Sequence, residues 1–204
     1  MELRNSNTKI NLLRAFAGES QARNRYDIAA EKAKKEGLHI IESLFKYTAN
    51  QEKAHAEAFI SKLKDFAGSN IAIDNATYPI DGDDSTLKLL QSSAHNEFQE
   101  HDVVYKEFAE TAKAEGFSDI AILFENIASI EKIHGERFDR YAKELENNTL
   151  FKNSTNVKWM CTNCGFVYEG AEPPKYCPVC GKPQGYALLF ENSLFEWYKN
   201  WIIT

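Results

Sequence analysis

Two Glu-x-x-His pairs stand at matching places in two similar halves of this 204-residue chain. The first pair is Glu52 with His55, and the second is Glu131 with His134. Residues three apart lie on one face of a helix, so each pair presents a carboxylate and an imidazole together. Both groups are ligands for iron and related metals. One such pair is common on solvated helices, but two in repeated register predict a metal site.

The two halves repeat with a constant offset. The repeated positions are Tyr26 and Tyr105, Gly37 and Gly116, Glu52 and Glu131, and His55 and His134. Each half also has an earlier glutamate, Glu19 or Glu97, which we expect on the preceding helix. Four carboxylates and two imidazoles would then surround one point, a ligand set that neutralises and bridges two divalent ions. The repeated tyrosines are either hydrogen-bond donors to these ligands or plain core residues.

The second half has one extra residue. Glu19 precedes Tyr26 by seven positions, whereas Glu97 precedes Tyr105 by eight. A π-bulge accommodates such an insertion, but a helix that starts at a different place gives the same spacing. Glu100 follows Glu97 by one helical turn, so we expect a fifth carboxylate at the site; a surface position is the simpler alternative.

Apolar periodicity predicts four long helices, over residues 8–35, 38–66, 86–115 and 119–146. Gly37 and Gly116 are expected to end the first and third, and Ser118 to cap the last. Asp84 or Ser85 is expected to cap the third helix. In the last helix we expect these residues to be buried: Ile122, Ile127, Ile130, Phe138 and Tyr141. The connection over residues 67–84 is long, as crossovers in helical bundles are.

The four cysteines lie within one short stretch and form two C-x-x-C pairs separated by 12 residues. They are Cys161, Cys164, Cys177 and Cys180. Each pair is followed by a glycine, Gly165 or Gly181, which lets backbone N–H groups turn toward the thiolates. Four thiolates suit one tetrahedral zinc or iron ion. The spacing does not choose between a structural zinc ribbon and an iron centre.

Composition limits the remaining function classes. The formal net charge of −6 argues against nucleic acid as a partner. No apolar run is long enough to span a membrane, and the polar start shows no leader peptide, so we expect a reducing, cytoplasmic location. We expect a helical domain over residues 1–147, a polar linker over 148–157, a cysteine domain over 158–190 and an aromatic tail over 191–204.

The combined motifs resemble the rubrerythrin family. The resemblance rests on Glu19, Q-E-K-A-H at Glu52, Glu97 with Glu100, E-K-I-H at Glu131, and the C-x-x-C-G and C-P-V-C-G sequences. It covers the chain up to about Phe190. It implies an all-α four-helix ferritin-like bundle with a small C-terminal rubredoxin-like β/turn metal domain. It also implies a peroxidase that reduces hydrogen peroxide, with electrons from NAD(P)H through partner redox proteins, and a head-to-tail homodimer.

The resemblance also implies roles for individual residues. Glu52 and Glu131 resemble bridging ligands of a di-iron site, and Glu19 resembles a terminal ligand of one iron. Glu97 and His134 would serve the other iron. Glu100 and His55 resemble an exchanging pair, in which the oxidised iron binds Glu100 and the reduced iron binds His55. The cysteines would hold one iron, for which zinc is a possible substitute.

Two other functions stay open at this point. A ferroxidase or iron-storage protein of ferritin type would share the carboxylate ligands, but Glu100 and the cysteine domain argue against it. A zinc-ribbon binding module on a helical dimer would share the cysteines. The tail holds seven large apolar residues and is expected to dock on its own bundle or on a second subunit. These residues are Leu194, Phe195, Trp197, Tyr198, Trp201, Ile202 and Ile203.

Overall fold

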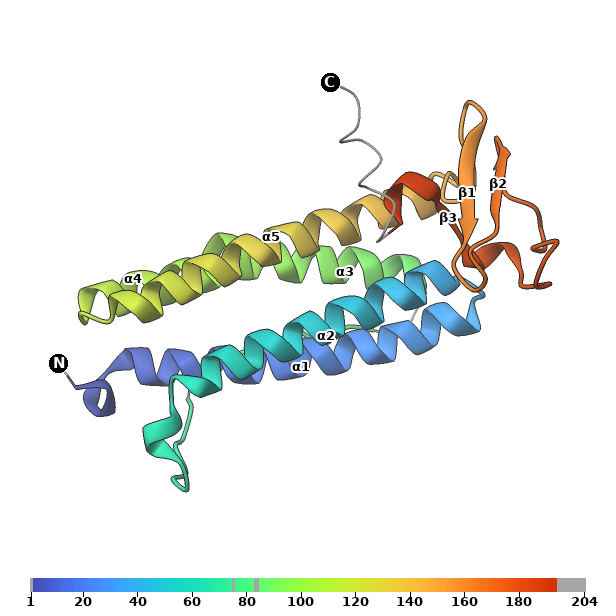
Figure 1. Ribbon diagram of the computed structural model, residues 1–204. Helices are drawn as coiled ribbons and strands as arrows, with labels where there is room; N and C mark the ends of the chain where they lie inside the picture. The colour runs from blue at the N-terminus through green and yellow to red at the C-terminus, as the bar shows by residue number, and fades with distance from the viewer. Residues whose placement is uncertain (1, 75, 83–84, 194–204) are drawn as a thin grey trace.

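The computed structural model describes residues 2–74, 76–82 and 85–193. Within these ranges the chain forms a bundle of long helices with a small β-sheet domain at one end (Figure 1). The bundle consists of α1 (Asn7–Lys35), α2 (His39–Ser61), α3 (Thr86–Gln99), α4 (Tyr105–Ala114) and α5 (Ser118–Glu146). The N-terminus lies at the end away from the small domain (Figure 1). The expected bundle with a small metal-binding domain is confirmed. No helix of the described part is long and apolar enough to cross a membrane.

Glycines reverse the chain at the same place in both halves. Gly37 has φ of +76° and Gly116 has φ of +88°, a conformation that residues with a Cβ rarely adopt. The following N–H groups bond back to the helix, from Leu38 to Ala33 at 2.9 Å and from Phe117 to Ala112 at 2.8 Å. These bonds satisfy carbonyl groups that the helix end leaves free. Both predicted helix ends are confirmed.

Several predicted boundaries need correction. α2 ends at Ser61, and the chain continues as a short 3₁₀ turn over Lys64–Phe66. The predicted helix was too long because Leu63, which lies beyond the end of α2, is also buried and continues the helical spacing of apolar residues. Ser85 caps α3, since its side chain accepts a hydrogen bond from the N–H of Lys88.

Two predictions for α5 are wrong. Ser118 is the first helical residue, and the N-cap is Phe117, whose apolar side chain cannot make a cap hydrogen bond. Ile122 is 53% exposed. Ile120 and Phe124, two residues to either side, are buried, and residues two apart face nearly opposite ways on a helix.

The extra residue of the second half is absorbed by a π turn. α3 passes into α4 through π-helical residues Glu100–Val104. The bulge interpretation is therefore confirmed, and the shifted helix start is excluded. Because the π turn takes up the insertion, Tyr105 regains the register that Tyr26 has in the first half.

The small domain holds an antiparallel sheet. Among the described residues its strands are β1 (Val157–Cys161), β2 (Val167–Gly170) and β3 (Ala187–Leu189), in the order β2-β1-β3. Within the segment expected as a polar linker, Leu150 is buried against the bundle core. The tail residues 194–204, with their predicted docking, lie outside the described residues.

The small domain contacts the nearby end of the bundle. The Tyr186 ring stacks on His39 at the start of α2, with 4.0 Å between ring centroids. Gly185 lies so close to Gly37 that a Cβ there would meet the Gly37 carbonyl oxygen at 1.8 Å. The backbone contact at residue 185 therefore requires glycine.

The apolar core of the described bundle lies in two clusters with a gap between them. One cluster includes Phe45 and Phe138 near the small domain, and the other includes Phe59 and Phe124 toward the far end. On α1, α2, α3 and α5 the residues between the clusters are those predicted to bind metal. Packing on both sides therefore fixes the four helices around a polar layer.

Candidate metal centres

The helices bring the predicted carboxylates and imidazoles into two groups that overlap. One group is Glu19, Glu52, His55 and Glu131, and the other is Glu52, Glu97, Glu131 and His134. In each group the potential ligand atoms all lie within 4.8 Å of one another. Glu52 and Glu131 belong to both groups. This overlap is the arrangement that two bridging carboxylates between two metal ions require.

The layer is buried although it consists of ionisable groups. Glu19, Glu131 and His134 are 0% exposed, and His55, at 7%, is the most exposed of the six. Burial of so much charge is unfavourable unless a cation or protons compensate it. Several carboxylate oxygens have no hydrogen-bond donor within the described part of the chain: Glu19 Oε2, Glu52 Oε1, Glu97 Oε2 and both oxygens of Glu131.

His134 gives a direct test of whether a metal fits. Its Nε2 lies 3.1 Å from the side-chain oxygen of Gln51, which makes Nε2 the protonated nitrogen. Nδ1 is then a lone-pair acceptor, yet it lies 3.0 Å from Glu52 Oε1 and 2.8 Å from Glu131 Oε2. These contacts lack hydrogen-bond geometry. The lone pairs of Nδ1 and of the two carboxylate oxygens are thus close together, which is the environment that a bound cation requires.

The two repeated tyrosines support the carboxylates crosswise. The hydroxyl of Tyr26 donates to Glu97, and that of Tyr105 donates to Glu19, so each half supplies the donor for the other. Their rings pack among phenylalanines, Tyr26 against Phe138 and Tyr105 against rings of the other cluster. Each tyrosine is therefore both a hydrogen-bond donor to a site carboxylate and a core residue, the two roles between which the sequence did not decide.

Burial and mutual electrostatic interaction shift the pKa values of the carboxylates and imidazoles in the layer. Burial, together with neighbouring carboxylates, raises the pKa of Glu19 and of Glu97 well above the usual range. Burial would also raise the pKa of Glu52, but the nearby imidazoles of His134 and His55 outweigh it and lower this pKa to about 2. For His134 burial disfavours the charged ring, yet Glu131 and Glu52 raise its pKa to about 12. Metal binding must therefore displace protons from the layer.

Glu100 lies beside the layer and outside both tight groups. It is half-buried in the π turn and lines a pocket of about 600 Å³ between α1, the α3–α4 helix and the crossover. Burial, with the charges of Glu131 and Glu52, raises its pKa to about 8, while Arg25 acts in the opposite direction. The carboxylate of Glu100 is therefore close enough for Glu131 and Glu52 to shift its pKa, but it belongs to neither ligand group.

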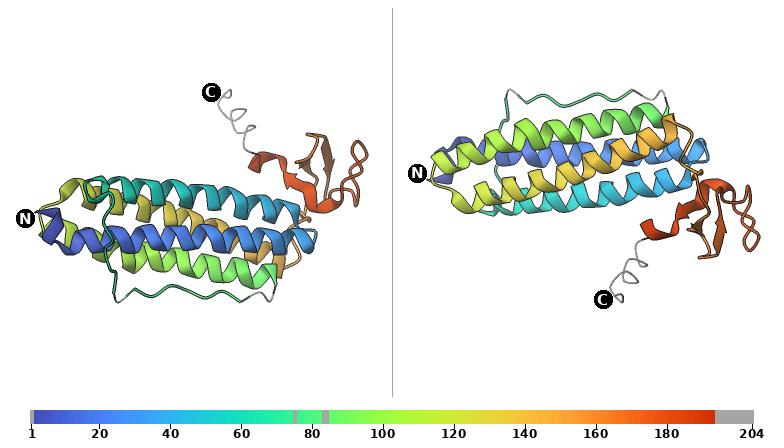
Figure 2. Two further views of the ribbon diagram at one scale, coloured as in Figure 1. Left: turned by 90° about the horizontal axis from the view of Figure 1, so that it is seen from below. Right: turned by 90° about the horizontal axis from the view of Figure 1, so that it is seen from above.

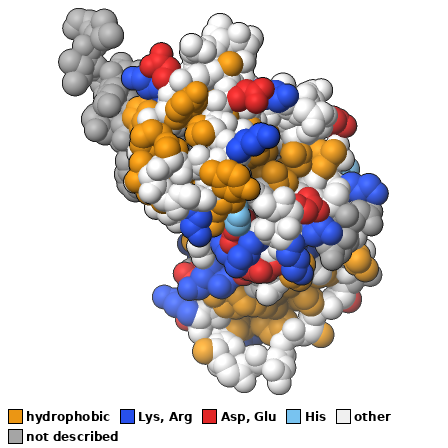
Figure 3. Space-filling view, turned by 90° about the vertical axis from the view of Figure 1, so that its right-hand side faces the viewer, with side chains coloured by type: hydrophobic (Ala, Val, Ile, Leu, Met, Phe, Trp, Pro, Cys, Tyr) orange, Lys and Arg blue, Asp and Glu red, His pale blue; other side chains and the backbone are white. Residues whose placement is uncertain are grey.

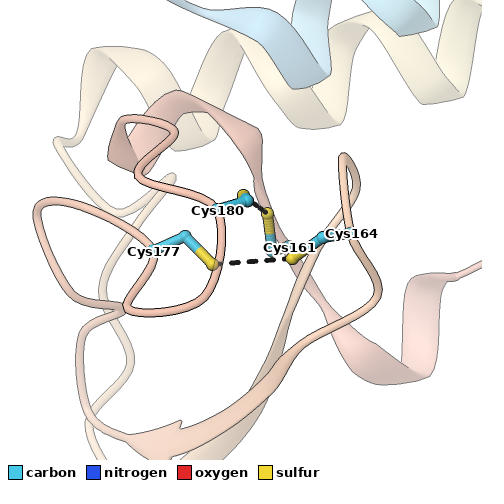
Figure 4. A group of neighbouring side chains, drawn as sticks. All are labelled: Cys161, Cys164, Cys177 and Cys180. Atoms are coloured by element: carbon cyan, nitrogen blue, oxygen red, sulfur yellow. Dashed lines mark hydrogen bonds between the residues drawn. The ribbon is translucent and has the colours of Figure 1, made fainter.

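The four cysteine sulfurs converge in the small domain (Figure 4). Sγ of Cys161 lies 3.7 Å from that of Cys180, and Sγ of Cys164 lies 3.6 Å from that of Cys177. A tetrahedron with metal–sulfur bonds of about 2.3 Å has edges of about 3.8 Å, so the spacing fits one metal ion. A disulfide needs about 2 Å.

Glycines shape both cysteine turns. Gly165 and Gly181 have φ of +77° and +69°, as the sequence predicted from their place after each pair. The backbone N–H of Lys182 lies toward Cys180 and is the main cause that lowers the pKa of this thiol to about 6. Backbone amides thus favour the thiolate form that binds metal.

Comparison with known proteins decides the family. The sequence signature "Rubrerythrin" matches residues 11–81 and 88–161, and "Rubrerythrin, rubredoxin-like domain" matches residues 159–186. The chain belongs to the rubrerythrin family. The rubrerythrin of Clostridium perfringens is 41% identical over 191 residues, which cover 94% of this chain and 98% of that protein. The rubrerythrin of Nitratidesulfovibrio vulgaris is 39% identical over 195 residues, with 96% and 98% covered.

Solved structures agree with the rubrerythrin assignment. Nigerythrin in its fully reduced, all-ferrous state superposes with a TM-score of 0.60 at 25% identity, covering 91% of this chain and 87% of that one. The rubrerythrin family binds iron. The carboxylate–histidine layer is therefore a candidate di-iron site, and the cysteines form a rubredoxin-like site.

Two contributors to the site were not predicted from the sequence. Gln51, which orients His134, corresponds to Ile130 in the second half, and Arg25, near Glu100, corresponds to Val104. The repeat therefore gave no signal for either residue. Gln51 could have been found from its place on α2 one residue before Glu52, but its partner only becomes visible in the folded bundle.

Proposed function

We propose that the protein is a non-haem di-iron peroxidase that reduces hydrogen peroxide to water, with electrons from the four-cysteine iron. The observation that carries this proposal is the pair of overlapping ligand groups with Glu100 beside them, next to a pocket. A plain storage site has no evident use for a carboxylate held just outside its ligand set. The proposed ligands are Glu19, Glu52, His55, Glu97, Glu100, Glu131 and His134 for the di-iron site, and Cys161, Cys164, Cys177 and Cys180 for the single iron.

In this proposal Glu52 and Glu131 would bridge the two irons. Glu19 and His55 would hold one iron, and Glu97 would hold the other together with the histidine that Gln51 orients. Membership of Glu52 and Glu131 in both groups supports the bridging roles. His55 and Glu100 would exchange as ligands, because ferric iron favours an anionic oxygen donor and ferrous iron accepts a neutral nitrogen.

A diferrous pair would supply the two electrons that cleavage of the O–O bond needs. The residues of the chain do the rest. The phenols of Tyr26 and Tyr105 keep Glu97 and Glu19 in place, and apolar rings on both sides of the layer exclude water. Glu100, when it is not a ligand, is positioned to hold a proton on its carboxyl oxygen at the inner end of the pocket.

The electron route is proposed to cross between two chains. The small domain contacts the bundle at His39, which is sixteen residues from His55, or about 24 Å along a helix axis. A second chain arranged head to tail would bring its cysteines closer to this site.

The proposed outside donor is a rubredoxin or an NAD(P)H-dependent reductase in the cytoplasm. Tyr176 and Val179, beside the cysteines, are 68% and 66% exposed, and apolar side chains are exposed among charged ones at this end (Figure 3).

The proposal is tested with reduced, iron-loaded protein mixed anaerobically with hydrogen peroxide. Mössbauer spectra follow the di-iron site, and the visible spectrum follows the four-cysteine iron. We expect both centres to oxidise as peroxide disappears. If both stay reduced while peroxide persists, the peroxidase proposal is wrong. Retention of a large iron core after aerobic addition of ferrous salt would instead favour the storage function.

A further inference from the structure

The pocket beside Glu100 is much larger than hydrogen peroxide needs. Its volume of about 600 Å³ lies within the range of about 300–1,000 Å³ typical of small-molecule sites. A water molecule occupies about 30 Å³ in the liquid, and hydrogen peroxide has only one more oxygen. The pocket therefore has room for an organic group as well.

The crossover builds the outer wall of this pocket and is tied to the bundle. It runs along the outside of the bundle (Figure 2). The hydroxyl of Tyr78 donates to the Arg14 carbonyl at 3.1 Å. Arg25 Nε lies 3.2 Å from Asp81, and both side chains are 12% exposed. Asn96 also donates to Asp81. The wall is thus held to the bundle at Tyr78 and at Asp81, and the pocket is part of the folded structure.

The lining combines polar and apolar side chains. Glu100 and Tyr105, whose hydroxyl donates to Glu19, join the pocket to the site. Apolar side chains of the lining are those of Ala15, Ala76, Pro79, Val104 and Phe108, and they stand beside polar ones such as Thr77, Asn96 and Gln99. The apolar side chains favour an alkyl or aryl group, because contact with them removes apolar surface from water.

The charges of the lining are balanced. Arg14 donates to Asn11 and to the Asp74 carbonyl, and its guanidinium lies 3.6 Å from the Asp74 carboxylate. Glu107, also in the lining, is exposed and negative. The pocket thus has no unbalanced cation for an acidic substrate, and it suits an uncharged one.

We infer that this pocket binds the organic group of uncharged alkyl and aryl hydroperoxides, which the protein reduces to alcohols. The inference rests on the proposed peroxidase function. In the reaction the O–O bond breaks, with two electrons that a bound diferrous pair would supply. The alkoxy oxygen takes one proton and leaves as the alcohol, and the hydroxyl oxygen takes another and leaves as water.

The test compares cumene hydroperoxide with hydrogen peroxide as oxidants of the iron-loaded, reduced protein. Ala76→Phe fills the pocket from the crossover. Ile73→Phe, on the same segment but outside the lining, is the matched control. We expect Ala76→Phe to lower kcat/KM for cumene hydroperoxide relative to hydrogen peroxide by about tenfold or more, and Ile73→Phe to leave this ratio unchanged. Calorimetry of the oxidised protein should show binding of the product, 2-phenylpropan-2-ol, that Ala76→Phe abolishes and Ile73→Phe retains.

Each outcome has a separate meaning. If the unmodified protein is oxidised by hydrogen peroxide but not by cumene or tert-butyl hydroperoxide, the inference is wrong and the peroxidase function stands. If no peroxide oxidises it, the peroxidase function itself fails. Equal slowing of both oxidants by Ala76→Phe, or binding of the alcohol that this change leaves intact, would mean that the pocket does not recognise the organic group.

Discussion

The two candidate metal sites of this chain are built in opposite ways. The carboxylate layer takes its ligands from every long helix of the described bundle and buries them, with His55 the most exposed at 7%. The cysteine site takes all its ligands from two short turns, and Cys164 is exposed. Side chains such as Gln51 and Tyr105 orient the first site, whereas backbone amides support the second. The layer therefore depends on the whole bundle, and the cysteine site depends on local turns.

The largest expected effect comes from removing a ligand shared by both groups of the layer. Glu131→Ala takes a carboxylate from each group and leaves the remaining charges poorly matched to two cations. We expect the iron content to fall by about two ions per chain, with the helices intact by circular dichroism and the cysteine iron retained. Glu136→Ala, on an exposed part of the same helix, is the control. Full di-iron occupancy in Glu131→Ala would show that this carboxylate is not a bridge.

Removing one cysteine should separate the two sites functionally. Cys177→Ser is expected to abolish the visible spectrum of the four-cysteine iron and the turnover driven by a reductase. Direct oxidation of the chemically reduced di-iron site by peroxide should persist, because the bundle does not depend on the small domain for its ligands. Glu169→Gln, at an exposed position on β2 of the same domain, is the control. Equal loss of both activities would contradict this independence.

The pH dependence of the metal-free protein should report the charge of the layer. Folding raises the pKa of His134 to about 12, although burial alone would lower it, and burial raises that of Glu100 to about 8. Both groups hold protons more tightly when folded, so their stabilising contribution is full at low pH and is lost as pH rises. We expect Tm of the metal-free protein to fall as pH rises from about 5 to about 8, the range in which Glu100 loses its proton, and to fall further above it as His134 loses its own.

The iron-loaded protein is the comparison for this measurement. Its ligands have already lost their protons, so its Tm should change much less over the same pH range. A metal-free protein whose Tm rises with pH would mean that the layer is not protonated in the way its geometry indicates.

The smallest expected effect is that of a single supporting hydroxyl. Tyr105→Phe keeps the ring between Phe59 and Phe124 but removes the donor to Glu19. A buried group that loses its hydrogen bond costs about 1–3 kcal/mol, which chemical denaturation of the metal-free protein can measure. Tyr176→Phe, at a 68% exposed position, should change little. If the two variants have the same free energy of unfolding, Tyr105 contributes only through the packing of its ring.

The same contrast explains what the sequence could and could not predict. Ligand identities and turns were predictable because they depend on spacing along one element, as with Gly116 or the C-x-x-C pairs. Spacing alone could not distinguish a π turn from a shifted helix start, since both put Glu97 eight residues before Tyr105. Only the complete bundle resolves this, because Tyr105 must reach Glu19 on another helix.

Features that depend on distant segments were missed or misjudged. The pocket wall needs the crossover to meet α1 and α3, and no local pattern encodes the Arg25–Asp81 pair. The contact between Gly185 and Gly37 joins residues far apart in the sequence. Ile122 was assigned to the core from its hydrophobicity, although its position between Ile120 and Phe124 places it on the other face.

The π turn over Glu100–Val104 adds to the differences between the two halves, which also differ at Gln51 and Arg25. A perfect duplicate would give both candidate metal positions the same surroundings and therefore the same reactivity. The inserted residue leaves the crosswise tyrosines in place but brings an additional acid, with the pocket that it lines, to the layer. The candidate site is thus asymmetric, and a small molecule that enters the pocket should meet its two positions unequally.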